Sequence, residues 1–230
     1  GNVWAHPHGW IDLSMRVITN EAGEATGVHQ TWRMDPFYSL VVFEELQQVP
    51  GASLEEGLDQ LGSDIRDNLV PQHYFTELRI NRERLAFGEV TEYTAMERDG
   101  RLTFMFILPL ESPQPLQGNV LEYQVFDPTY YIEVVHEADN DGPSKGALVL
   151  NGEPACELSI IAADPDPELV LQAALLLASF PEFQYEAGFL GGHFAADADP
   201  PKPAATRESR PPAIQSPAAA ERGLHIQDHP

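Results

Sequence analysis

Cysteine is nearly missing from this 230-residue chain, and positive charge is scarce. Cys156 is the only cysteine, so no disulfide can form within the chain and no Cys-x-x-Cys pair exists for zinc or redox chemistry. Lys and Arg number 13 against 36 Asp and Glu, which gives a formal net charge of -23. Because so acidic a surface repels phosphate backbones, we expect no nucleic acid as a partner.

Long hydrophobic runs and the common enzyme motifs are also absent. The longest apolar-rich run, Leu169–Phe180, is too short to cross a bilayer, so we expect no membrane insertion of this chain. There is no Gly-x-Ser-x-Gly, no phosphate loop and no His-Glu-x-x-His. These absences favour a monomeric binding protein over an enzyme.

The N-terminal residues carry the pattern that signal peptidase recognises. Val3 and Ala5 stand at the minus-three and minus-one positions before His6, which would make His6 the first residue of an exported, periplasmic protein. The alternatives are that Gly1–Ala5 were added during cloning, or that the match to a loose pattern is accidental.

Two alternating runs begin the domain. Trp10–Ile18 and Val28–Asp35 each alternate apolar and polar residues, and a turn rich in glycine and acidic residues separates them. They predict a β-hairpin with one buried face. The buried face of its first strand is predicted to carry Ile11, Leu13, Met15 and Val17.

Helices and further strands follow the hairpin. Helical spacing predicts helices over Tyr38–Gln48 and over Ser53–Val70, the second capped by Ser53. Short strands, mostly antiparallel, are expected between Tyr74 and Ile161, and an apolar helix over Pro167–Phe180.

The predicted fold class is α+β: an antiparallel or mixed sheet seeded by the N-terminal hairpin, two inserted helices, one C-terminal helix and a disordered tail. We expect one domain over residues 6–196, with a possible lobe boundary at Ser112–Gln117, where Pro113 and Pro115 interrupt the strands. Residues 197–230 are rich in proline, alanine and charge, and predict a disordered tail or linker.

The sharpest local feature is His6-Pro7-His8. Two imidazoles on an extended segment, separated by a proline that limits the backbone, are suitable ligands for a divalent transition metal. If His6 is the mature N-terminus, its α-amino group and ring could also chelate one copper ion together.

Strand alternation brings carboxylates toward these histidines. His8 and Asp12 share the polar face of the hairpin with Asp35, and a turn centred near Gly23 and Glu24 would place Asp35 opposite Asp12. Asp35 could equally be the cap of the helix that Pro36 begins.

Asp12 has an alternative to metal ligation. Arg33 lies on the same face of the hairpin, and an ion pair between the two side chains is the more common use of such a pair. We expect two other histidines, His29 and His136, to be exposed.

Five motifs in order resemble the DUF1007 family of bacterial periplasmic proteins, over about His6–Ile161. They are His6-Pro7-His8-Gly9-Trp10-Ile11-Asp12, Trp32-Arg33-Met34-Asp35-Pro36-Phe37-Tyr38-Ser39, Asn68-Leu69 with Tyr74-Phe75-Thr76, Phe87-Gly88, and Asp127-Pro128-Thr129-Tyr130-Tyr131. The resemblance implies an accessory protein of transition-metal transport that works with an inner-membrane permease of the NicO class. It also implies that His6, His8, Asp35 and Asp127 fall on recurring polar positions.

Two of the positions in these motifs have alternative roles. At His73 the family often carries a carboxylate or an amide, so this side chain is either an extra ligand or a local substitution. Asp127 begins Asp-Pro-Thr-Tyr, which is also a good type I turn.

The sequence thus predicts capture of zinc, or of nickel or cobalt, for a membrane permease. The candidate ligands are His6, His8, Asp35 and Asp127, with Asp12 and His73 as further candidates. One alternative is an oxidative copper enzyme built on His6, with a third nitrogen from His29, His73 or His193. The other is an interaction module that binds no metal.

Overall fold

The computed structural model describes residues 9–128, 132–150, 156–160 and 223–228. β1 (Gly9–Thr19) and β2 (Glu24–Met34) form the predicted hairpin. Its predicted buried residues all lie in the core. The turn is closed by Asn20, whose Oδ1 accepts hydrogen bonds from the backbone N–H groups of Ala22 and Glu24, both at 3.0 Å.

The register of this hairpin differs from the predicted one. Asp12 lies opposite Arg33, and Asp35 is bonded beside Trp10, with 3.0 Å between the Asp35 N–H nitrogen and the Trp10 carbonyl oxygen. The prediction that Asp35 faces Asp12 was therefore wrong by two residues. The physical reason is a turn that lies earlier in the chain, where Gly23 takes a positive φ of 73° and the pairing shifts between Ile18 and Thr19.

The hairpin lies within a mixed sheet, which we call the first sheet. The strand order is β11-β1-β2-β6-β5, and β8 also pairs with β1. Both β8 and β11 run parallel to β1, whereas the remaining pairs are antiparallel. The added strands are β5 (Tyr93–Arg98), β6 (Arg101–Pro115), β8 (Ile132–His136) and β11 (Leu148–Leu150).

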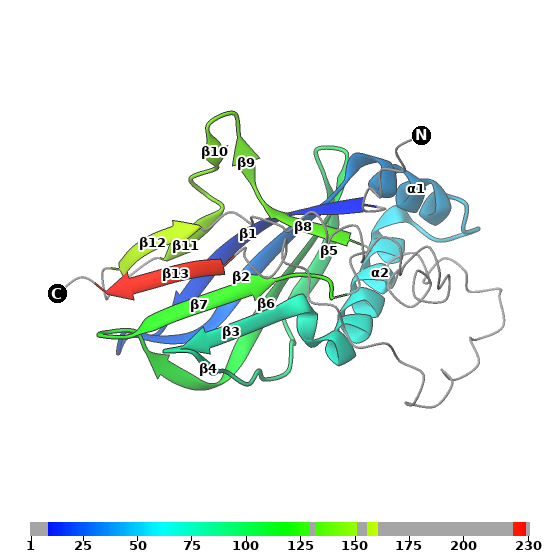
Figure 1. Cartoon of the computed structure of the whole chain (residues 1–230). Coiled ribbons are helices and arrows are strands. Elements are labelled where there is room, and N and C mark those ends of the chain that lie inside the picture. Colours follow the sequence, from blue (N-terminus) through cyan, green and yellow to red (C-terminus); the bar gives the residue numbers. More distant parts are fainter. Residues whose placement is uncertain (1–8, 129–131, 151–155, 161–222, 229–230) are drawn as a thin grey trace, which may run out of the picture.

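A second, antiparallel sheet packs across the first (Figure 1). Its order is β12-β13-β7-β3-β4. Its strands are β3 (Thr76–Ile80), β4 (Glu83–Arg84), β7 (Val120–Val125), β12 (Cys156–Ile160) and β13 (Gly223–Asp228), and a two-stranded sheet is formed by β9 (Ala138–Asp139) and β10 (Gly142–Pro143).

β13 corrects the expectation of a disordered tail over all of residues 197–230. Gly223–Asp228 lies between β12 and β7 and pairs with both. The residues alternate, with Leu224 and Ile226 between polar neighbours, which is a strand pattern too short to stand out after a proline-rich stretch. The rest of the predicted tail lies outside the described residues, as does the predicted helix Pro167–Phe180.

Both predicted inserted helices are confirmed, and they lie at the end of the sheets where β1 begins (Figure 1). α1 (Pro36–Gln47) packs on β6, and α2 (Leu54–Leu69) packs on β5. α2 begins with a complete capping box between Ser53 and Glu56. A short 3-10 segment, η1 (Val70–Phe75), leads from α2 to β3.

Prolines 113 and 115 do not end the strand that contains them. β6 continues to Pro115 and still pairs with the start of β2, beyond a shift in register between Ala25 and Gly27. A strand can hold proline where its pairing is irregular, because the missing N–H then costs no regular ladder bond. The predicted lobe boundary at Ser112–Gln117 thus has no break of secondary structure at its prolines.

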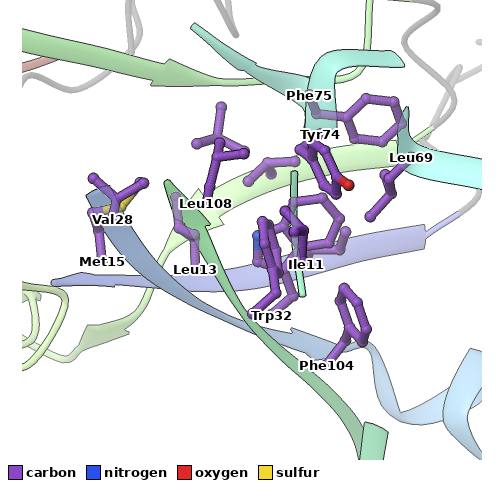
Figure 2. Packing of buried hydrophobic residues seen from close by; sticks show 14 of the residues in the cluster. Ile11, Leu13, Met15, Val28, Trp32, Leu69, Tyr74, Phe75, Phe104 and Leu108 are labelled. Carbon is purple, nitrogen blue, oxygen red and sulfur yellow. The ribbon is translucent and has the colours of Figure 1, made fainter. Parts of the chain in front are cut away.

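The hydrophobic core fills the space between the two sheets around Trp32 (Figure 2). The Trp32 ring stacks on Phe75 from the end of η1 at 6.0 Å between centroids, and Phe106 meets it edge-on at 5.2 Å. The fold class is therefore α+β with mixed and antiparallel sheets, and the aromatic core fixes the end of η1 against β2.

Candidate metal site

Asp35 ends the hairpin and starts α1, and it is buried, with 4% relative exposure. Its Oδ1 accepts a hydrogen bond of 2.9 Å from the Tyr38 backbone N–H, so the predicted helix cap is present. Its backbone carbonyl accepts from the Ser39 hydroxyl at 2.8 Å. These bonds use one carboxylate oxygen and hold the side chain in place, while the other oxygen points elsewhere.

The second carboxylate oxygen of Asp35 lies against Gly9. A Cβ added at Gly9 would be only 2.7 Å from Asp35 Oδ2, which is closer than real Cβ contacts come. Glycine at this position is therefore what allows the carboxylate to reach the backbone of β1. Gly9 directly follows His8 in the chain, so the carboxylate lies where the His-Pro-His segment joins the sheet.

Asp127 lies shortly before β8, which pairs with β1 on the side away from β2. It is buried, with 2% relative exposure, and its Oδ2 accepts a hydrogen bond of 3.1 Å from the Ile132 backbone N–H. Ile132 is the residue of β8 that pairs with Gly9. Asp35 thus contacts the Gly9 position itself, whereas Asp127 bonds the residue that pairs with Gly9 on the neighbouring strand.

Asp12 forms an ion pair, although with a different arginine from the predicted one. Asp12 Oδ2 lies 2.6 Å from Nη2 of Arg101, which is in β6. Arg33 instead contacts Glu137 at 2.5 Å. Asp12 and Arg33 are directly opposite on adjacent strands. The expected pair between them was nevertheless wrong, because each side chain reaches a partner from another part of the chain.

His73 lies in an unusual backbone segment. It is exposed, and it begins a run of three non-glycine residues with positive φ, of 51°, 55° and 53° for His73, Tyr74 and Phe75. The Phe75 carbonyl accepts from the N–H of Phe126 at 2.8 Å, and Phe126 precedes Asp127. The structure therefore places His73 two residues from a contact with the segment that carries Asp127, and no described contact joins its side chain to a carboxylate.

His29 and His136, the described histidines of the first sheet, are both half-buried, so the expectation that they are exposed was wrong. Burial, and secondarily the nearby positive charge of Arg16, lower the pKa of His29. His136 Nε2 lies 2.6 Å from the hydroxyl of Tyr123, which joins β8 to β7 of the second sheet. Both residues lie far along β1 from Gly9, opposite or beside Arg16 and Leu13.

The two remaining candidate ligands, His6 and His8, lie outside the described residues. Among the residues described, no group of three His, Cys, Asp or Glu side chains is placed to hold a metal ion. A metal site at Gly9 would therefore need ligands from outside the described residues, as His6 and His8 would be. Oxygen ligands from Asp and nitrogen ligands from His together suit zinc, nickel, cobalt and copper.

Sequence reasoning did not find Arg101, which supports this end of the hairpin. Its guanidinium donates from Nε to the Met34 carbonyl at 2.6 Å and from Nη2 to the Arg33 carbonyl at 3.2 Å, in addition to its contact with Asp12. These bonds hold the last two residues of β2 before Asp35. Arg101 is far from the hairpin in sequence, and no local pattern indicates its role.

No helix of the described part is long and apolar enough to cross a membrane.

Comparison with known proteins places the chain in a family. A family model described as "Protein of unknown function (DUF1007)" matches residues 1–198. An uncharacterized protein of Haemophilus influenzae is 29% identical over 177 residues, covering 76% of this chain and 81% of its own. An uncharacterized 15.5 kDa protein in the trpE 3' region of Spirochaeta aurantia is 30% identical over 101 residues, covering 39% of this chain and 67% of its own. No solved structure matches. The family match covers most of the sequence, and the chain therefore belongs to the DUF1007 family.

Proposed function

We propose that this protein binds a divalent transition metal as cargo, zinc foremost, and is not an enzyme. The ligands proposed are His6 and His8 from the N-terminal segment, and Asp35 and Asp127 from the folded domain. The observation that carries the proposal is the buried Asp35 carboxylate against Gly9, directly after the His-Pro-His segment, with a second buried carboxylate, Asp127, bonded to the residue that pairs with Gly9.

The chemistry of these four side chains fits such a cargo. Two imidazoles and two carboxylates complete the four-coordinate shell that zinc prefers, and the same set accepts nickel, cobalt or copper. Each carboxylate is oriented by a backbone N–H, from Tyr38 for Asp35 and from Ile132 for Asp127. Support of this kind fixes ligand orientation and typically strengthens metal affinity.

Asp12 and His73 take lesser roles in this proposal. Asp12 is paired with Arg101, and that arginine holds the backbone leading into Asp35. Asp12 thus acts through Arg101 to position the ligand, and does not ligate the metal. His73 is a further candidate ligand, and the experiment below tests it with a His73→Ala variant.

Delivery to a partner completes the proposal. Resemblance to the family suggests that the protein works in the periplasm, where it passes its metal to an inner-membrane permease. Ligands that come partly from a segment before the first strand favour transfer, because two ligands can leave without unfolding the domain.

The decisive experiment is calorimetric titration with Zn²⁺, Ni²⁺, Co²⁺ and Cu²⁺. The proteins compared are the full chain, a chain beginning at His6, and the double variant His6→Ala, His8→Ala. A His73→Ala variant and a His29→Gln variant accompany them, the latter as a control histidine remote from Gly9. Loss of two direct ligands should weaken zinc binding by more than about 100-fold, since loss of a supporting contact alone costs about 10–100-fold.

The outcomes separate the competing functions. Unchanged zinc affinity in the double variant would refute the proposed site. A redox-active copper signal that appears only when the chain begins at His6 would favour an oxidative copper enzyme. Failure of all four metals to bind or to raise the unfolding temperature would favour an interaction module without metal.

A further inference from the structure

The outer side of α1 carries a stripe of exposed apolar side chains. Phe37, Leu40 and Val41 have relative exposures of 77%, 56% and 50%. Their spacing of three and four residues puts them on one side of the helix, opposite the buried Ser39, Val42 and Leu46. We call Phe37, Leu40 and Val41 the α1 stripe. Monomeric proteins seldom leave such clustered apolar groups uncovered unless they bind something.

Negative charge lies at one end of the α1 stripe. Residues 36–65, which include α1 and most of α2, contain six carboxylates and no Lys, Arg or His. Glu44 continues the stripe one turn beyond Val41 and is exposed.

We propose that the α1 stripe is a docking surface for a basic amphipathic helix of a partner protein. Apolar side chains of that helix would cover the α1 stripe, and its Lys or Arg residues would face Glu44. Apolar burial would supply affinity, and charge complementarity would set the choice of partner. The proposal does not depend on metal binding.

Charge argues against three other occupants. A second copy carries the same net charge of -23, and its own α1 stripe brings no Lys or Arg to Glu44. A lipid surface with anionic headgroups would repel a protein of net charge -23. The apolar segment Pro167–Phe180 of this chain contains one charged residue, Glu168, and so offers no positive charge to the carboxylates.

A binding experiment with a defined probe tests the proposal. The probe is a fluorescent amphipathic Leu/Lys peptide of about 14 residues, or four helical turns, with a Leu/Glu peptide of the same pattern as its control. Fluorescence anisotropy would compare the full chain with the triple variant Phe37→Gln, Leu40→Gln, Val41→Gln and with the single variant Glu44→Lys. The matched control is Val49→Gln, Val70→Gln, which replaces two apolar residues of similar exposure, 51% and 53%, outside the α1 stripe.

We expect the Leu/Lys peptide to bind the native chain and the control variant equally. The triple variant should bind it at least ten-fold more weakly, and Glu44→Lys should also weaken it, more so at low salt. The Leu/Glu peptide should not bind. Equal binding of the Leu/Lys peptide to the native chain and the triple variant would overturn the proposal, since attraction to any acidic surface would then explain it.

Three further measurements identify a wrong occupant. Sedimentation velocity that shows a dimer lost in the triple variant would assign the α1 stripe to a second copy. Binding to vesicles of zwitterionic lipid that is lost in the triple variant would assign it to a membrane. A lower unfolding temperature in the triple variant than in the control variant would show that the chain covers the α1 stripe itself, and would overturn the proposal as well.

Discussion

The two oxygens of Asp35 have separate tasks, which substitution can distinguish. Oδ1 caps α1 and Oδ2 lies against Gly9. Serine is as good a helix cap as aspartate. In the absence of metal, the free energy of unfolding of Asp35→Ser should therefore lie within about 0.5 kcal/mol of the native value. Asp35→Ala removes the cap and should lower the free energy of unfolding by about 1–2 kcal/mol.

Metal affinity should follow a different order from stability. Both variants lack the carboxylate, so both should bind zinc more weakly, by a similar factor of about ten or more. Urea unfolding followed by circular dichroism measures the first effect, and calorimetry measures the second. Ser53→Ala, which removes the cap of α2, is the control: it should lower stability by about 1 kcal/mol and leave zinc affinity unchanged.

Two results would refute this reasoning in different ways. If Asp35→Ser bound zinc as tightly as the native chain, the carboxylate would not be a ligand, and the burial of Asp35 would be explained by capping alone. If Asp35→Ala were as stable as the native chain, the cap made by Oδ1 would contribute nothing to stability.

Two further predictions concern polar groups of the hairpin. Gln30 is fully buried, accepts a hydrogen bond from Trp32 Nε1 at 2.8 Å and donates one to Thr76 Oγ1 at 2.9 Å. Gln30→Leu leaves both groups without this partner, so it should lower the free energy of unfolding in urea by about 2–4 kcal/mol. A loss below about 0.5 kcal/mol would contradict the value given to this network. The pKa of His29 is lowered in the folded state by burial and then by Arg16, so the unfolded chain takes up its proton first as the pH falls. Stability should therefore decline from about pH 7 toward pH 5, and His29→Gln should make that decline shallower, as thermal unfolding across this range would show; an unchanged slope would exclude His29 as its source.

Local patterns in the sequence were sufficient for the hairpin and the two inserted helices. Alternation identifies the buried face of β1, and Ser53 and Asp35 mark the starts of the helices. The register was missed because a hairpin's pairing depends on where the turn closes, and the choice between turns near Asn20 and near Glu24 is made by a few hydrogen bonds.

Contacts between distant parts of the chain were beyond what local patterns could predict. The parallel pairing of β8 with β1 sets Ile132, the hydrogen-bond partner of Asp127, beside Gly9, and only the resemblance to a family had singled out Asp127. Arg101 likewise reaches Asp12 from a distant strand. One signal was overlooked: Gln30 occupies a core position between Val28 and Trp32 in an otherwise apolar alternation, which marks a buried polar network.

The position of β13 has a consequence for the order in which this protein can fold. Among the described strands, Gly223–Asp228 is the one that joins β12 to β7, and residues 161–222 must be synthesised before that strand is available. Through that interval a nascent chain would hold β7 with an incomplete edge, and such edges are where chains join each other wrongly. Completion of the second sheet is thus a late, long-range step, and the slowest phase of refolding should be the one that a deletion of residues 223–228 removes.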